Sequence, residues 1–132
     1  MKSSLITKLD REFSKYIRLR DAMGSYFRCI SCGKIKPIQQ ADCGHFYSRR
    51  HMATRWDEDN CNAECRACNR FDGDHLLGYR ERLRRKIGDQ RFAALAIRAK
   101  STRKWSEFEL ERLIEYYKQE NKQLEQLKGI RL

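Results

Sequence analysis

The stretch ADCGHFYSRRHMATRWDEDNCNAECRACNRFDGDH, residues 41–75, holds all three histidines of the chain and four of its six cysteines. Carboxylates, arginines and asparagines lie between them. Thiols and imidazoles bind metals, and imidazoles and carboxylates transfer protons. The stretch therefore indicates either a zinc-stabilised binding module or a catalytic centre whose shape is maintained by zinc.

Two CxxC pairs, Cys29/Cys32 and Cys65/Cys68, predict a zinc site. A CxxC turn presents two thiolates about 2.3 Å from one ion, and two such pairs complete a tetrahedron. Gly33 follows the first pair and suits a left-handed turn. Redox chemistry is the alternative, but it is favoured by a βαβ pattern that this chain lacks. Four thiolates leave no position for water, so we expect a structural zinc.

Cys43 and Cys61 lie outside these pairs. We interpret them as small buried thiols, because free cysteine behaves as a small hydrophobic residue. A second metal site, formed by these two cysteines with His51, is the alternative.

Length and charge limit the function classes. The 132 residues suit a single domain, and the formal charge of +11 favours a polyanionic partner, nucleic acid before an anionic membrane. No apolar run approaches the ~18 residues that span a bilayer, and the N-terminus lacks a signal-peptide pattern. We therefore expect a cytoplasmic, soluble protein with no membrane partner, whose cysteines bind metal rather than form disulfides.

The chain divides into three parts within this one domain: residues 1–24, 25–78 and 79–132. Apolar periodicity predicts a helix over residues 3–22 in the first part. The second part is expected to contain a short extended segment at residues 25–28, a strand pair within 34–47 interrupted at Pro37 and Gly44, and a polar loop over 48–60. A helix is expected to begin near Cys65 or Cys68.

The third part is predicted to be helical, basic and amphipathic. Leu76, Tyr79, Leu83 and Ile87 form one apolar stripe, and Asp89 is expected to cap the next helix, after Gly88. Ser106 and Glu109 form a capping box for the last helix, whose stripe comprises Leu110, Leu113, Tyr117, Leu124 and Leu127. So few heptads favour an intramolecular face over a coiled coil.

The order CxxC, His45, Asn60, CxxC and Asn69 resembles the HNH, or ββα-metal, nucleases over roughly residues 26–78, and is nearest to phage resolvases of the endonuclease VII type. The wider stretch, with GHFYSRR, RWDEDN and ECRACN, resembles the NinG (Rap) recombination proteins of lambdoid phages. That family is associated with cutting branched recombination intermediates.

The resemblance implies an α+β fold: a small ββα-metal core with a four-cysteine zinc site, flanked by N- and C-terminal helices. It implies an endonuclease that uses Mg²⁺ or Mn²⁺ to hydrolyse phosphodiester bonds in branched DNA, such as a Holliday junction or a D-loop. It also suggests a homodimer, because junction resolution needs two active sites.

Hydrolysis of a phosphodiester needs a base for water and a cation for the developing charge. His45, beside a glycine at a strand end, is the candidate base, since a neutral imidazole suits that role. Asn69 offers an oxygen to Mg²⁺, a hard ion, from the first turn of the expected helix. Asp72, three residues later, is expected on the same helical face as a second ligand.

One departure from the family pattern concerns Gly44, where many HNH enzymes have a metal-binding aspartate directly before the histidine. The metal-binding function of that aspartate is then either missing from this chain or supplied by Asp72, Asp74 or His75. The pattern Asp42-x-Gly44-His45 resembles the DRGH motif of the non-specific ββα nucleases, which implies a supporting role for Asp42. Asn60 matches the middle asparagine of HNH motifs, which ties the loop to the backbone.

Two groups of arginines are candidates for phosphate binding. Arg49, Arg50 and Arg55 lie in the polar loop, and Arg80, Arg84 and Arg85 lie off the apolar stripe of the basic region. Solvated arginines without a ligand are the alternative for each of them.

Three functions remain open from the sequence. The first is the structure-specific endonuclease, with His45, Asn69, Asp42 and Asp72 at its centre. The second is a non-catalytic zinc module that binds nucleic acid or protein. Such a module needs the zinc and the basic residues but not these four candidate catalytic residues. The third is an HNH nuclease that cuts a defined sequence in linear duplex.

Overall fold

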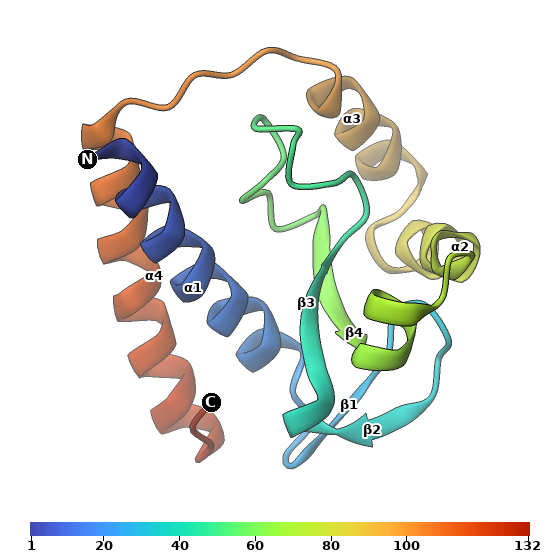
Figure 1. Cartoon of the computed structure of the whole chain (residues 1–132). Coiled ribbons are helices and arrows are strands. Elements are labelled where there is room, and N and C mark those ends of the chain that lie inside the picture. Colours follow the sequence, from blue (N-terminus) through green and yellow to red (C-terminus); the bar gives the residue numbers. More distant parts are fainter.

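The computed structural model describes residues 1–132, and it combines helices with two small antiparallel sheets (Figure 1). The elements are α1 Lys2–Asp21, β1 Tyr26–Arg28, β2 Ile35–Pro37, β3 Ala41–His45, β4 Cys61–Cys65, α2 His75–Ile87, α3 Asp89–Ala99 and α4 Glu107–Lys128. A 3₁₀ turn, Ile38–Gln40, separates β2 from β3, and a π-helical turn, Ala67–Phe71, follows β4. The expected mixture of helices and short strands is therefore present.

The strands pair differently from the sequence-based prediction. Segments 35–37 and 41–45 are both extended, but they do not pair with each other: β2 pairs with β1, and β3 pairs with β4. The 3₁₀ turn between them redirects the chain. β4 itself was not predicted. Its residues alternate between apolar and polar types, but the stretch is only five residues long and its polar members, Asn62 and Glu64, are buried like the rest.

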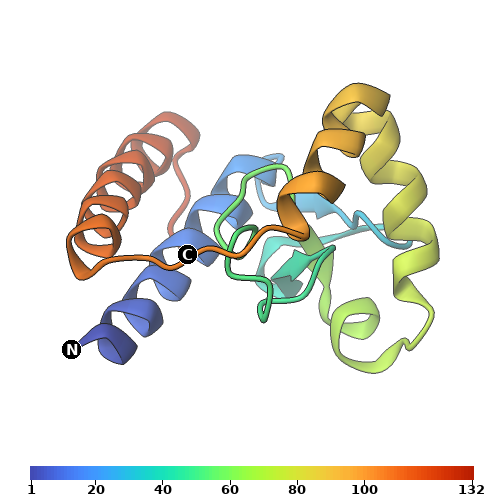
Figure 2. The same cartoon turned by 90° about the horizontal axis from the view of Figure 1, so that it is seen from above.

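Helices cover both sides of the β3–β4 pair. Figures 1 and 2 show α1 and α4 on one side of this pair and α2 and α3 on the other. One apolar cluster joins α1 to α4 and to the loop before β4 through Phe13, Trp56 and Leu110, while another joins α2 to α3 through Tyr79, Leu83 and Leu95. The strand pair is thus held between two helical layers.

α1 and α4 run side by side in the same direction. The N-terminal amino group lies 3.4 Å from Glu107, and the Lys128 ammonium donates to the Leu19 carbonyl oxygen at 2.8 Å. Leu9, Phe13 and Ile17, spaced four residues apart, form the buried face of α1. The apolar stripe of the last helix therefore has an intramolecular partner, although Leu127 at its end is exposed.

Local signals at the helix ends were partly correct. The capping box of Ser106 and Glu109 begins α4 as predicted. Asp89 was expected to cap α3, but it is the first residue of that helix, and its carboxylate accepts from the Arg84 guanidinium at 3.2 Å. Gly88 precedes it with φ +87°, a backbone conformation that explains why glycine occupies this joint.

No helix is both long and apolar enough to cross a lipid bilayer.

Candidate functional site

The four cysteines of the CxxC pairs converge on one point. The sulfur atoms of Cys29, Cys32, Cys65 and Cys68 all lie within 4.8 Å of one another. The first pair lies in the turn between β1 and β2, and the second lies at the end of β4 and in the π-helical turn. The donor set fits a tetrahedral zinc ion, which would join the two small sheets to the turn that carries Asn69.

The surroundings of these sulfurs also suit a thiolate site. The Cys29 sulfur accepts the backbone N–H groups of Cys65 at 3.3 Å and Ser31 at 3.4 Å. Gly33, at φ +76°, donates its N–H to the Cys29 carbonyl oxygen at 2.9 Å and closes the turn. Burial raises the pKa of the Cys68 thiol well above its usual range, so a metal must displace that proton, and acid weakens binding.

A cavity of about 510 Å³ opens along the edge of β3. Its lining comes from α1, β3, the following loop, the π-helical turn and the start of α2: Asp10, Phe13, Ser14, Asp42, Cys43, His45, Ser48, Arg49, Asn69, Arg70 and His75. Three of the four predicted catalytic residues, Asp42, His45 and Asn69, therefore border one space.

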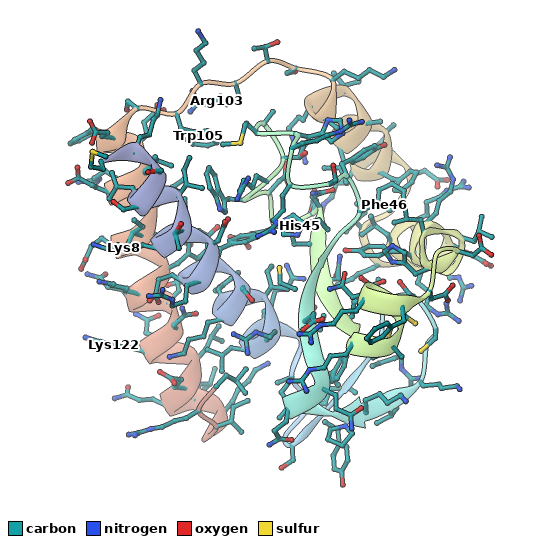
Figure 3. All side chains as sticks on the ribbon, viewed as in Figure 1. Lys8, His45, Phe46, Arg103, Trp105 and Lys122 are labelled. Carbon is teal, nitrogen blue, oxygen red and sulfur yellow. The ribbon has the colours of Figure 1, made fainter.

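His45 ends β3 and lies in the space between that strand and α1 (Figure 3). Its Nε2 is 2.9 Å from the Arg55 carbonyl oxygen, which fixes the tautomer with a proton on Nε2 and leaves Nδ1 as the basic nitrogen. Burial lowers the pKa of His45 from its ordinary value of 6.5, an effect that the bond to Arg55 partly offsets. The imidazole is consequently neutral near pH 7.

Asp42 holds Asn69 and Arg70 together. Its carboxylate accepts from the Asn69 amide at 3.0 Å and from two nitrogens of the Arg70 guanidinium, each at 2.9 Å. Since the Asn69 amide uses its N–H₂ group on Asp42, its Oδ1 remains available to a cation. Asp42 is therefore placed to orient Asn69, in keeping with a supporting role.

Asp72 does not lie where the sequence placed it. The helix expected from Cys68 onward is interrupted: the π-helical turn ends at Phe71, Asp72 is extended, and α2 begins only at His75. The Asp72 carboxylate accepts the Asp74 N–H at 2.9 Å, and neither residue borders the cavity. Same-face spacing required a continuous α-helix, and the chain does not form one here.

Asn60 ties both ends of the 48–60 loop together. Its side chain is fully buried, donates to the Tyr47 and Thr54 carbonyl oxygens at 2.9 and 3.0 Å, and accepts the Tyr47 N–H at 2.8 Å. The loop holds Arg55, whose carbonyl orients His45. Asn60 thereby acts on the cavity through backbone geometry rather than by contact with a ligand.

The three loop arginines differ in whether their side chains are available to bind a ligand. Arg55 donates two hydrogen bonds to the Asp10 carboxylate, at 3.0 and 2.6 Å, and is mostly buried, so it stabilises the loop instead of facing a ligand. Arg49 is exposed, borders the cavity and lies 3.7 Å from Asp10. Arg50 is exposed and outside the cavity lining. Arg49 is the loop arginine best placed for a phosphate.

The arginines of α2 already have contacts within the chain. Arg80 lies over the Phe92 ring, Arg84 pairs with Asp89, and Arg85 pairs with Glu81. Such exposed ion pairs contribute little stability and can exchange for phosphate. Arg85 also lines a second cavity of about 660 Å³ beside the first CxxC turn, together with Arg28, Arg82 and Lys86. That cavity contains no histidine, whereas the cavity beside β3 has two, His45 and His75.

A second group of metal-ligand atoms exists, but with a different histidine from the one expected. The ligand atoms of Cys43, His45 and Cys61 lie within 4.8 Å of one another, because His45 pairs with Cys61 across the strands and Cys43 lies two residues away on the same face. His51, the predicted third member, is not in this group. Cys61 is completely buried in the apolar cluster with Trp56.

Sequence reasoning missed several cavity residues. Asp10 and Ser14 come from α1, far away in the sequence, and no local motif pointed to them. Arg70 could have been noticed from its position beside Asn69. His75 was considered, but its partner was not: Nδ1 of His75 lies 2.5 Å from the carboxylate of Glu64, a fully buried residue of β4.

Glu64 also explains the glycine before His45. A Cβ atom built on Gly44 would lie 2.3 Å from the Glu64 Oε1 atom and 2.8 Å from its Cβ. We therefore expect Gly44→Ala to lower the free energy of unfolding by about 1–3 kcal/mol through overpacking. Chemical denaturation measures this effect. Gly73→Ala is the matched control, because a Cβ there meets nothing within 4 Å. Equal stability of the two variants would contradict this account of Gly44.

Residues 1–127 match the family described as Bacteriophage Lambda NinG protein. Protein ninG of Escherichia phage 933W is 31% identical over 90 residues, which cover 67% of this chain and 43% of that protein. Protein ninG of Salmonella phage P22 is 32% identical over 88 residues, which cover 66% and 41%.

The chain thus spans less than half the length of these curated relatives. No solved structure matches it. Because the family match extends over nearly all of the sequence, the chain belongs to the NinG family of bacteriophage proteins.

Proposed function

We propose that this chain is an HNH-type, ββα-metal endonuclease that hydrolyses phosphodiester bonds in branched DNA with the help of a divalent ion. The observation that carries the proposal is the shared cavity of His45 and Asn69. A neutral imidazole, an amide oxygen free for a cation and the basic side chains of Arg49 and Arg70 border one space there. These are the groups that phosphodiester hydrolysis needs.

The local fold supports the same assignment. The β3–β4 pair supplies His45 from the end of one strand, and the helical turn after the second strand supplies Asn69. A four-cysteine zinc site would fix that turn against the strands, as the resemblance to ββα-metal nucleases implies. The substrate class, branched recombination intermediates, comes from the family resemblance. The net charge of +11 suits a nucleic-acid substrate.

In the proposed mechanism, His45 Nδ1 takes a proton from the attacking water while Nε2 stays bonded to the Arg55 carbonyl oxygen. Asn69 Oδ1 would hold Mg²⁺ or Mn²⁺, and Asp42 keeps that amide oriented. When bound, the ion supplies positive charge to the scissile phosphate. Arg49 and Arg70 bind the flanking phosphates.

The deciding experiment compares substrates with the zinc-loaded protein in Mg²⁺ and in Mn²⁺. Synthetic four-way junctions, D-loops and linear duplexes of matched sequence are incubated and the products mapped. We expect cleavage near the branch point and none of the linear duplex. Cleavage of linear DNA at one sequence would instead favour a sequence-specific nuclease, and tight binding without cleavage would favour a non-catalytic zinc module.

The pH dependence of cleavage should reflect the lowered pKa of His45. The base works only when neutral, so the rate should stay on its plateau at pH 7 and fall only below pH 6.5, the ordinary value. Rates measured between roughly pH 5 and pH 8 test this. An acid limb with its midpoint above pH 6.5 would contradict the prediction.

The same group affects stability in the corresponding direction. Below pH 6.5 the unfolded chain protonates His45 while the folded chain keeps it neutral, so the free energy of unfolding falls as the pH falls from the unfolded pKa to the folded one. His45→Asn should remove this component of the acid sensitivity of the free energy of unfolding.

A further inference from the structure

A buried carboxylate occupies the space that a side chain at position 44 would fill. The residue before His45 is Gly44, and the space that its side chain would fill contains the Glu64 carboxylate, with Oε1 2.3 Å from the expected Cβ position. Glu64 comes from the neighbouring strand, β4, and has no solvent exposure. The structure therefore supplies a carboxylate at this place from another part of the sequence.

The Glu64 carboxylate is incompletely satisfied. Oε2 accepts the Ser31 hydroxyl and the His75 Nδ1–H, whereas Oε1 is buried and accepts no hydrogen bond. His75 is also the only ion-pair partner of Glu64. An unpaired oxygen on a buried carboxylate is costly unless positive charge lies beside it. A cation bound at His75 would place positive charge beside this carboxylate.

His75 connects this carboxylate to the cavity. Its Nδ1 is bonded to Glu64 at 2.5 Å, its side chain is 19% exposed, and it borders the same cavity as Asn69. Nε2 makes no hydrogen bond within the chain, so it is the ring nitrogen left for a ligand. Metal-binding histidines typically donate their second ring N–H to a carboxylate in this way.

We propose that His75 Nε2 is the companion ligand of Asn69 for the divalent ion, with Glu64 as the residue that orients it and balances its charge. This inference rests on the proposed endonuclease function, since it completes the same site. It also refines the choice of ion: imidazole suits Mn²⁺, Co²⁺ or Ni²⁺ better than Mg²⁺, whose preferred ligands are oxygens. Mn²⁺ should therefore support cleavage at lower concentration than Mg²⁺.

Pulsed electron paramagnetic resonance of Mn²⁺ added to the zinc-loaded protein tests the proposal without any substrate. The wild type should bind Mn²⁺ and show a coupling to one coordinated histidine nitrogen. His75→Ala should abolish the coupling, whereas His45→Ala should retain it. A coupling that survives in His75→Ala, or bound Mn²⁺ without nitrogen coupling in the wild type, would overturn the proposal, as would a wild type that binds no Mn²⁺.

Titration calorimetry of Mn²⁺ binding gives the second readout. We expect about 10–100-fold weaker binding in His75→Ala and about 10-fold weaker binding in Glu64→Gln, which keeps the shape of the buried side chain but loses its charge. His51→Ala, outside the cavity, is the matched control and should bind as the wild type does. Unchanged affinity in Glu64→Gln would remove Glu64 from the proposal.

Zinc content and circular dichroism establish that each variant is folded, and His75→Gln replaces the alanine variant if that one does not fold. The outcomes separate the two proposals. If the wild type shows nitrogen coupling that depends on His75 but cuts no DNA, the proposed metal site stands and the proposed endonuclease function is wrong. If the protein cuts DNA equally well without His75, the endonuclease function stands and His75 is not a ligand of the catalytic ion.

Discussion

Replacing His45 with alanine should lower the rate of junction cleavage by about 100- to 10,000-fold, the range that general-base catalysis contributes. His45 borders the cavity, its tautomer is fixed by the Arg55 carbonyl oxygen so that Nδ1 is the basic nitrogen, and its pKa is lowered by burial. Binding of the junction should change little, because the phosphate contacts come from other side chains. Single-turnover rates and gel-shift affinities measure the two effects separately.

His51→Ala is the control for this experiment. His51 lies in the same loop region but outside the cavity, so its loss should leave cleavage near the wild-type rate. Retained cleavage in His45→Ala would remove His45 from the role of base. Equal losses in both variants would indicate damage to the loop rather than to the chemistry.

Replacing both cysteines of the second CxxC pair, as Cys65→Ser/Cys68→Ser, should abolish zinc binding and with it cooperative folding of the centre. Structural zinc sites of this kind contribute about 10–16 kcal/mol of binding free energy in small domains. The four sulfurs join β1–β2, β4 and the turn that presents Asn69. Elemental analysis and thermal unfolding measure the outcome.

Cys43→Ala/Cys61→Ala is the matched control for zinc binding, since these two cysteines form the other cluster with His45. We expect one zinc per chain in the wild type and in this control, and none in Cys65→Ser/Cys68→Ser. Two zinc ions in the wild type that fall to one in the control would show that His45 is a zinc ligand. His45 could not then serve as a free base.

The sequence determined the features that depend on local spacing. Two CxxC pairs can present their thiolates only through tight turns, so their convergence was predictable before any fold was known. The capping box of Ser106 and Glu109 and the apolar face of α1 are equally local, because helical periodicity relates neighbouring residues directly.

The sequence could not determine the course of the chain after Cys68. A continuous helix was the simplest continuation, but the π-helical turn and the extended Asp72 break it, which excludes Asp72 from the cavity and begins α2 at His75. β4 was missed for a related reason: five residues are too short a pattern to identify a strand, and only packing decides that its polar residues Asn62 and Glu64 are buried. Both errors concern segments whose conformation depends on packing.

The tertiary structure alone decided which distant residues share the site. Asp10 of α1 fixes the loop through Arg55, and Glu64 of β4 fills the space beside Gly44 and holds His75. Read from the sequence, Gly44 marked a missing ligand. In the folded chain it is the position where a side chain would collide with a carboxylate from the neighbouring strand. The position of the Glu64 carboxylate beside Gly44 depends on the register of β3 against β4. That register is fixed by the burial of whole strand faces and not by any local motif.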